Sequence, residues 1–213
     1  MSIRTEKKDI FMKHYYTNNI DLKTNRKEIE VDFLGNKYTF ITDLGVFSKN
    51  KLDFGTDVML REFINNNKKE KFKLLDIGCG YGTVTLLLSK FYKHSKYVLT
   101  DVNDRALELA DINCKNNMVE DYEIYKSNSF ENIHENFDII ISNPPIRAGK
   151  NIIFDIYENA YNHLYIDGDF YCVIQTKHGA KSTEKKLREV FGNCKTLGIH
   201  SGYRVYFCKK VKL

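Results

Sequence analysis

The feature that most constrains this fold is an alternation, after residue 71, of short apolar segments with stretches of helical periodicity. The apolar segments have the length of strands rather than of helices. Strands that alternate with helices in this way predict a parallel sheet covered by helices on both faces. Strands are expected at 72–77, 96–101, 121–126, 137–142 and 169–176, and helices at about 83–92, 104–116, 151–164 and 182–191.

The end of the chain departs from this alternation. Two further strands, 194–199 and 203–209, are separated only by His200-Ser201-Gly202. A connection this short cannot return the chain for a parallel pairing, so the last pair must be antiparallel. The predicted fold is therefore α/β, a doubly wound seven-stranded sheet whose last strand is antiparallel.

A smaller unit precedes the sheet. Alternating segments at 28–34 and 37–42 flank Gly35-Asn36, which predicts a β-hairpin. A helix is expected from Asp57 to about Asn66, with Thr56 or Asp57 as its cap. The polar run 65–71 marks the boundary between an N-terminal extension (1–70), packed on the core, and the main domain (71–213).

Composition excludes several classes of protein. No apolar run is long enough for a transmembrane helix, and the first residues lack the apolar region of a secretory signal. The five cysteines are scattered and form no metal-binding spacing, which predicts reduced thiols in a cytoplasmic protein without a metal. The net charge is +5, and residues 177–212 hold ten Lys/Arg against two acids. This basic stretch is either a solvated face or a contact for a polyanion.

A glycine-rich loop follows the first strand of the main domain. Gly78, Gly80 and Gly82 lie between an apolar strand and an apolar helix, where glycine lets the backbone approach a ligand. Asp76 would repel a pyrophosphate but suits a cationic ligand with an amino group. Asp101 ends the next strand, where a carboxylate can accept from both hydroxyls of a ribose. Together these residues predict a site for a nucleoside cofactor, whereas the loop alone would equally fit a tight turn.

The only two prolines form a stiff corner after the fourth strand, in the sequence SNPPIRAGK. In a doubly wound sheet this corner opens on the same edge as the glycine loop. The Asn143 side-chain oxygen and the Pro144 carbonyl could accept both hydrogens of an exocyclic amine, with Pro145 fixing the direction of that carbonyl. The alternative is a plain strand terminator.

The loop and Asp101 resemble the S-adenosylmethionine site of class I methyltransferases. The resemblance implies that Asp76 and the glycine loop lie near the methionine part and that Asp101 binds the ribose. Val102 would pack on the adenine, and Asn128 with Ser129 follows the third strand, where the family commonly has an acid for the adenine amino group. The cofactor residues implied are Asp76, Gly78, Cys79, Gly80, Gly82, Asp101, Val102, Asn128, Ser129, Phe47 and Thr56.

The proline corner resembles the (N/D)PP(Y/F/W) signature of methyltransferases that act on adenine N6, guanine N2 or glutamine amides. By that resemblance the catalytic residues are Asn143, Pro144, Pro145 and Ile146. Ile146 replaces the aromatic residue that stacks on the target in many members. Candidates for that stacking role elsewhere are Tyr15, Tyr16 and Phe47.

Two further segments, GVFSKNKLDFGT (45–56) and Gly202-Tyr203-Arg204-Val205, make the resemblance closer. With SNPPIRAGK they resemble small, stand-alone relatives of the 16S ribosomal RNA guanine-N2 methyltransferases, over about residues 14–208. The resemblance implies that Phe47 and the turn 53–56 cover the cofactor, although this turn equally fits a simple helix cap. Larger members carry a second, degenerate half for which this chain has no room.

The sequence thus predicts an S-adenosylmethionine-dependent N-methyltransferase that acts on a nucleobase amine, with guanine N2 of ribosomal RNA as the leading substrate. Alternatives are adenine N6, a protein glutamine, a small molecule, or a non-catalytic module that binds RNA through the same fold. Arg147, Lys150 and Lys177, with Lys181, are candidate phosphate contacts, although each alone also fits a surface charge. The lone histidines at 14, 178 and 200 suggest no catalytic triad.

Overall fold

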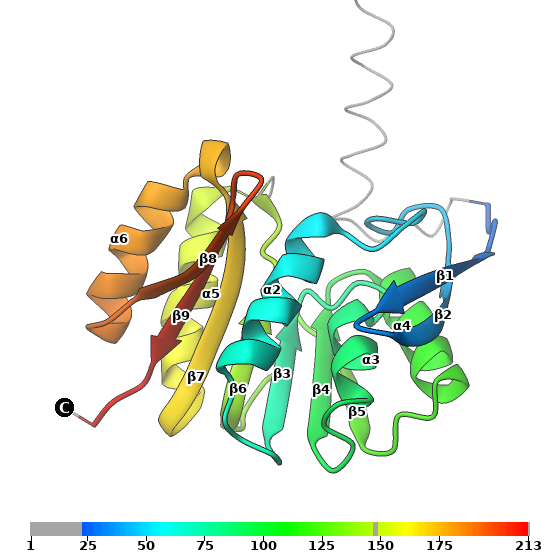
Figure 1. The fold of residues 1–213 in the computed structure, drawn as a ribbon, viewed down its shortest axis with the longest axis horizontal. Coiled ribbons are helices and arrows are strands. Elements are labelled where there is room, and N and C mark those ends of the chain that lie inside the picture. Colours follow the sequence, from blue (N-terminus) through cyan, green and yellow to red (C-terminus); the bar gives the residue numbers. More distant parts are fainter. Residues whose placement is uncertain (1–22, 147–148, 213) are drawn as a thin grey trace, which may run out of the picture.

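A computed structural model describes residues 23–146 and 149–212 of the chain. In this part of the chain a seven-stranded sheet has the order β5-β4-β3-β6-β7-β9-β8, with helices on both faces (Figure 1). The strands are β3 (Lys73–Ile77), β4 (Lys96–Asp101), β5 (Tyr122–Lys126), β6 (Phe137–Ser142), β7 (Leu164–Gln175), β8 (Lys195–His200) and β9 (Tyr203–Lys209).

The direction of the strands confirms the predicted fold. Strands β3 to β7 pair in parallel, and β9 pairs antiparallel with both β7 and β8. Each predicted strand end lies within one residue of the observed end except at the start of β7, which begins at Leu164 instead of residue 169. The early part of β7 pairs Leu164 with Phe137, and the register then shifts. This irregular pairing is not visible as an alternating sequence pattern.

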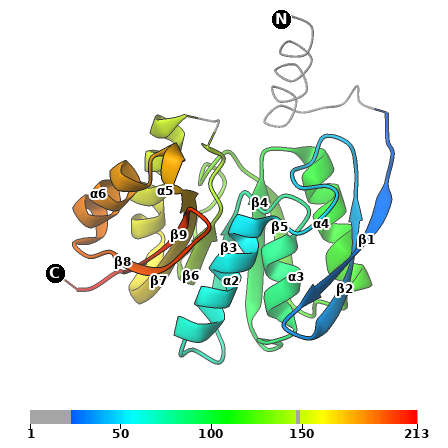
Figure 2. The same ribbon diagram turned by 45° about the horizontal axis from the view of Figure 1, so that its top comes forward.

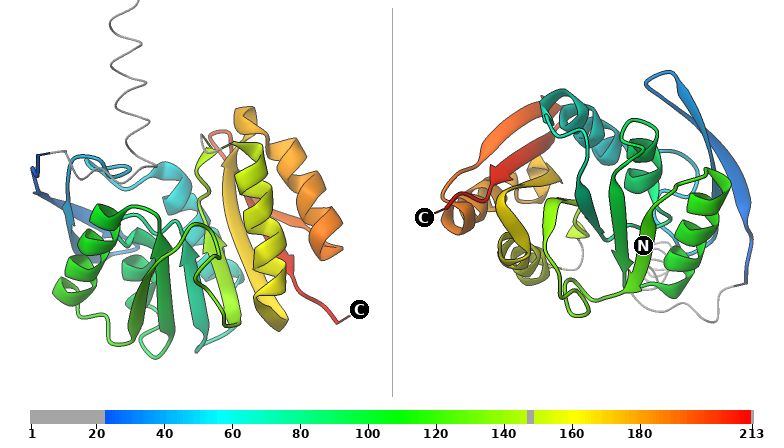
Figure 3. Two further views of the ribbon diagram at one scale, coloured as in Figure 1. Left: turned by 180° about the vertical axis from the view of Figure 1, so that it is seen from behind. Right: turned by 90° about the horizontal axis from the view of Figure 1, so that it is seen from below.

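The two faces of the sheet are covered by different helices. Successive strand residues point to opposite faces, so Leu74 packs with α2, α3 and α4, whereas Leu75 packs with α5 and α6. Helices α5 and α6 lie in front of the sheet when the molecule is seen from behind (Figure 3). The helices are α2 (Phe54–Asn66), α3 (Thr83–Ser89), α4 (Asp104–Asn116), α5 (Lys150–Asn162) and α6 (Ala180–Phe191), with a 3₁₀ helix η2 (Thr176–His178) after β7.

Helix α2 starts one turn earlier than the sequence predicted. Its N-cap is Asp53, whose side chain accepts a hydrogen bond from the Thr56 backbone N–H at 2.8 Å. The predicted cap at Thr56 or Asp57 is therefore wrong, because the Asp53 side chain caps the helix three residues earlier and Gly55 lies inside its first turn. Buried residues of α2, such as Phe63, join the core on one face of the sheet. The boundary predicted at residue 70 stays a prediction.

The predicted hairpin is formed by β1 (Lys27–Phe33) and β2 (Asn36–Thr42). Its turn is Leu34-Gly35, both with positive φ, and Phe33 pairs with Asn36. The predicted turn at Gly35-Asn36 is thus one residue late; the observed pair suits a two-residue hairpin turn with φ > 0 at both positions. Asn113 of α4 holds the hairpin, since its amide bonds both the N–H and the C=O of Ile41 at 2.6 and 2.9 Å.

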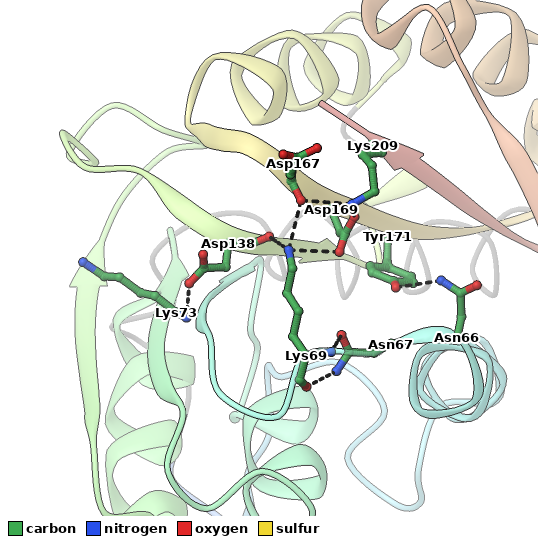
Figure 4. Close-up of polar contacts among 9 residues, drawn as sticks. All are labelled: Asn66, Asn67, Lys69, Lys73, Asp138, Asp167, Asp169, Tyr171 and Lys209. Carbon is green, nitrogen blue, oxygen red and sulfur yellow. Dashed lines mark hydrogen bonds and ion pairs between the residues drawn. The ribbon is translucent and has the colours of Figure 1, made fainter. Parts of the chain in front are cut away.

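A polar cluster closes the amino-terminal edge of the sheet (Figure 4). The buried carboxylate of Asp169 lies between two ammonium groups, 3.1 Å from Lys69 Nζ and 2.9 Å from Lys209 Nζ. Lys69 also donates to the backbone carbonyls of Asp138 and Asp167. One lysine thereby ties the connection between α2 and β3 to the two neighbouring strands β6 and β7.

Candidate active site

The carboxyl ends of the central strands surround a cavity of about 460 Å³. These ends lie at the top of Figure 1 and come forward in Figure 2. The volume is that of a typical small-molecule site. Most of the predicted site residues line it: Phe47, Thr56, Asp76, Gly78, Cys79, Gly80, Asp101, Val102, Asn128, Ser129, Asn143, Pro144, Pro145 and Ile146.

Other predicted residues lie elsewhere. Gly82 caps α3, and a Cβ there would come within 3.1 Å of Leu86 and 3.4 Å of Ala110, so it permits α3 to pack on α4. Lys150 begins α5, with its ammonium 5.0 Å from the Phe154 ring centroid, and Lys177 is exposed in η2. Three predicted residues, Arg147, Tyr15 and Tyr16, lie outside the described residues.

The glycine loop offers backbone next to open space. Gly78 and Gly80 have φ of 72° and 55°, a conformation that other residues adopt only with strain. A Cβ at either position would meet no atom within 4 Å. Glycine is therefore required here by the turn itself, and the turn leaves room for a ligand against the main chain.

Two carboxylates lie at this end of the cavity, of which Asp76 is buried and Asp101 is half-buried. Asp76 is 2% exposed, and burial followed by the nearby charge of Asp101 raises its pKa to about 8. Asp101 accepts from the N–H groups of Gly80 and Asn103, and burial raises its pKa as well. Among the described residues neither carboxylate forms an ion pair. A cationic ligand would remove this cost, since an opposite charge favours the ionised carboxylate.

The cavity wall after β5 also presents an unused polar group. Ser129 has a positive φ of 54°, and its Oγ is buried without a hydrogen-bond partner in the part of the chain that the structure describes. Ser127 holds this turn by donating to the Ser129 carbonyl at 2.9 Å. A buried hydroxyl in a cavity wall is suited to bond a ligand. Carboxylates, a glycine turn and this hydroxyl together fit a cationic nucleoside such as S-adenosylmethionine.

The proline corner carries a side chain with a fixed orientation. Asn143 Nδ2 donates to Asp53 Oδ2 at 2.9 Å and to Thr56 Oγ1 at 3.0 Å. A carboxylate only accepts, so the atom of the Asn143 amide that faces Asp53 must be the nitrogen. Because the amide is planar, its oxygen points away from Asp53. Asn143 thus presents a defined acceptor in the lining of the cavity.

The same Asp53 oxygen caps α2 and anchors Asn143. It accepts from the Thr56 N–H at 2.8 Å, the Thr56 hydroxyl at 3.3 Å and Asn143. A Cβ at Gly55 would lie 3.0 Å from this oxygen and 3.0 Å from Cε1 of Tyr203. The turn at 53–56 is therefore a helix cap, as one of the two interpretations held, and the cap is also bonded to the proline corner.

Several residues of the cavity were missed at the sequence level. Ile152 and Ile156 of α5, with His178 of η2, also line the cavity, and Ile152 is 41% exposed. Tyr81 donates to the Ser48 carbonyl at 3.2 Å and so holds the loop before α2 over the cavity. The signal for His178 was its place directly after β7, a strand whose end opens on the same edge as β6.

No group of His, Cys, Asp and Glu side chains among the described residues is arranged to hold a metal ion. None of the helices described combines the length and the apolar character that a membrane span requires.

Residues 37–207 match the methyltransferase small domain family. The chain belongs to this family. It is 36% identical over 200 residues to the uncharacterized protein YbxB of Bacillus subtilis (strain 168), covering 93% of this chain and 98% of that protein. It is 32% identical over 169 residues to ribosomal RNA small subunit methyltransferase C of Haemophilus influenzae (strain 86-028NP), covering 78% of this chain and 49% of that protein.

The fold is similar to solved methyltransferase structures. The 16S rRNA N2 methyltransferase of T. thermophilus, in complex with AdoMet and guanosine, superposes with a TM-score of 0.80 and 26% identity, covering 89% of this chain and 52% of that chain. A ribosomal protein L11 methylase from Lactobacillus delbrueckii subsp. bulgaricus shares the fold, with a TM-score of 0.64 and 19% identity. It covers 78% of this chain and 88% of that chain.

Family and fold are those of S-adenosylmethionine-dependent methyltransferases, which confirms the predicted resemblance, fold class and cofactor. The chain spans about half the length of the ribosomal RNA methyltransferases that it matches.

Proposed function

We propose that this protein transfers a methyl group from S-adenosylmethionine to an exocyclic amine of a nucleobase, and that the amine is N2 of a guanine in ribosomal RNA. The observation that carries the proposal is the Asn143 amide, whose nitrogen is anchored by Asp53 and Thr56 in the wall of the cavity. The match to ribosomal RNA methyltransferases supports the choice of substrate.

The reaction requires a poor nucleophile to be positioned. The lone pair of an exocyclic amine is delocalised into the base, so the amine attacks only when it is held in a suitable orientation. S-adenosylmethionine, when bound, supplies an electrophilic methyl group. Asn143 Oδ1 and the Pro144 carbonyl accept the two amine hydrogens and aim the nitrogen lone pair across the cavity. When the nitrogen gains the methyl group it becomes cationic, and one of its hydrogens is then lost as a proton to water. Such preorganised acceptors lower a barrier by several kcal/mol without a strong base.

An apolar wall takes the place of an aromatic residue on the substrate side. Ile146, Ile152 and Ile156 line the cavity beyond the proline corner. Exposed Ile152 would gain from contact with a flat base. Phe47, 48% exposed in the cavity lining, is the described aromatic candidate for stacking. Lys150 and Lys177 remain proposed contacts to RNA phosphates, and a ribosomal RNA substrate implies a cytoplasmic location.

The test is mass mapping of ribosomal RNA from cells that lack this protein, before and after treatment with the purified protein and S-adenosylmethionine. N2-methylguanosine at one position, absent before treatment and present after it, is the expected result. Methylated adenine in the RNA would make adenine N6 the substrate, and RNA that stays unmodified would leave a protein glutamine or a small molecule as the substrate. If isothermal titration showed no binding at millimolar S-adenosylmethionine, the hypothesis of an enzyme would be wrong. A non-catalytic RNA-binding module would then be the remaining hypothesis.

A further inference from the structure

The cavity continues onto an exposed surface beside β7. The residues of this surface, here called the η2 surface, are Phe54, Lys177, His178, Lys181, Ile199, Tyr203 and Arg204. Two contacts hold its parts together: the Thr176 N–H donates to the Gly202 carbonyl at 2.7 Å, and Arg204 Nε donates to Thr176 Oγ1 at 3.4 Å. His178 lines the cavity, so the surface and the cavity share an edge. In Figure 1 the turn between β8 and β9 stands at the same end of the molecule as the start of α2.

The η2 surface carries cations without counter-charges. Lys177 and Lys181 are exposed, and in the described part of the chain neither they nor Arg204 form an ion pair. His200 nearby bonds Glu62 at 2.7 Å and is therefore not counted as a contact for a ligand. Three cations at one edge of a cavity, each lacking a carboxylate, favour an anionic partner.

The opposite flank of the cavity has the reverse character. Between residues 104 and 131 the chain holds seven acids and three Lys/Arg. Each of these three cations already faces a carboxylate: Arg105 faces Asp43, Lys115 faces Asp111 and Lys126 faces Asp104. The part of a polyanion that extends out of the cavity would therefore lie on η2 rather than on α4.

The η2 surface also holds an exposed ring and an exposed aliphatic side chain, with Phe54 and Tyr203 on the α2 side of the strand ends and Ile199 beside Arg204 on the α6 side. Phe54 is 44% exposed, and its ring meets that of Tyr203 edge-on at a centroid distance of 5.5 Å. Ile199 on the edge strand β8 is 57% exposed. Proteins bind single-stranded nucleic acids by combining an exposed ring, on which a base stacks, with nearby cations that contact the backbone.

We propose that the η2 surface binds a single-stranded RNA segment, namely the nucleotides that flank the base in the cavity. Lys177, Lys181 and Arg204 contact its phosphates, and a base stacks on Phe54. This inference rests on the proposed function for the identity of the polyanion. A duplex would not stack on the ring, because its bases already stack on one another.

The test is fluorescence anisotropy with a fluorescein-labelled 15-nucleotide oligo(U) RNA, titrated at several salt concentrations. The triple variant K177A/K181A/R204A is compared with K71A/K93A/K195A, which loses the same charge. Lys71, Lys93 and Lys195 are exposed near the opposite ends of β3, β4 and β8. The first variant should bind about tenfold or more weakly, with the slope of log K against log salt reduced by about 2, since each single-strand phosphate contact contributes about 0.7. The control should bind like the wild type.

Stacking is tested separately with Phe54→Leu, which keeps an apolar side chain and removes the ring. Oligo(U) binding should weaken about tenfold, while the dissociation constant for S-adenosylmethionine, measured by isothermal titration, stays unchanged. Equal weakening in the two triple variants would overturn the proposal, and so would equal affinity for a 15-base-pair RNA duplex. Since binding is read without turnover, loss of binding in the η2 variant alone supports the surface even if no ribosomal RNA is methylated.

Discussion

An aspartate is buried at each of the two ends of the central strands, the amino end and the carboxyl end, and its surroundings differ. The two ends are called the amino edge and the carboxyl edge here. At the amino edge Asp169, 6% exposed, lies between the ammonium groups of Lys69 and Lys209 (Figure 4). At the carboxyl edge Asp76, 2% exposed, has the Thr85 hydroxyl at 3.5 Å and the charge of Asp101 nearby. Two lysines of the protein itself neutralise the first carboxylate, which therefore serves the fold. The second carboxylate is costly until a ligand brings a positive charge, which marks a site for function.

The largest effect is expected at the carboxyl edge, from Asn143→Ala. Removal of the oriented acceptor should lower kcat about 100-fold, about 3 kcal/mol, because the amine loses a positioning contact. The dissociation constant for S-adenosylmethionine should stay nearly unchanged. Single-turnover kinetics and isothermal titration measure the two quantities. Turnover at the wild-type rate would contradict the role of the proline corner.

The Asp53→Asn variant tests whether the Asp53 carboxylate orients Asn143 or only caps α2. Asparagine is an equally good cap, so stability should change little. Its amide can also donate, however, so it no longer dictates which atom of Asn143 it faces. We expect kcat to fall about 10- to 30-fold, a loss of about 2 kcal/mol.

A double-mutant cycle separates these roles. In an Asn143→Ala background, Asp53→Asn should cause no further loss of kcat, because two residues that act through one contact are not additive. Additive losses would mean that Asp53 acts on the reaction by another route.

A substitution at the amino edge should lower the stability of the protein and leave ligand binding unchanged. Lys69→Met removes one of the two partners of Asp169 and two bonds to backbone carbonyls. The free energy of unfolding should fall by about 2 kcal/mol, less than for a carboxylate left with no partner. Urea denaturation measures this change, and isothermal titration should find S-adenosylmethionine binding unaltered. A Lys69→Met variant with wild-type stability and weakened binding of S-adenosylmethionine would contradict the assignment of the amino edge to stability and of the carboxyl edge to ligand binding.

The smallest effect concerns pH at Asp76. Its pKa rises from 3.8 unfolded to about 8 folded, so its stability contribution is full below pH 4 and is lost as pH rises through 8. A bound cation favours the ionised carboxylate, so S-adenosylmethionine binding should release protons near pH 7. Its affinity should rise about three- to tenfold between pH 6.5 and 7.5. Titrations in buffers of different ionisation enthalpy measure this, and Asp76→Asn should flatten the dependence. An equally steep profile in that variant would assign the proton to another group.

Local patterns were enough to predict much of the fold and of the cavity. The spacing of apolar residues and the length of each apolar segment predicted the strands and helices of the main domain, because burial on a sheet or on a helix face imposes these spacings. The glycine loop and the proline corner were predicted to meet, since parallel strands end at one edge of a sheet. Helix boundaries were less certain: α2 was predicted to start at Asp57 but starts at Phe54, because the Asp53 side chain caps it.

What the sequence determined by itself is the order of elements, the family and most of the residues around the cavity, because each is set by neighbours in the chain. What only the tertiary structure decided is which distant residues touch. Asp53 and Asn143 are 90 positions apart, and no spacing rule joins a helix cap to a strand end. Packing of α2 against β7, β8 and β9 brings them together, and the hydrogen bonds then fix that the nitrogen of the Asn143 amide faces the helix cap.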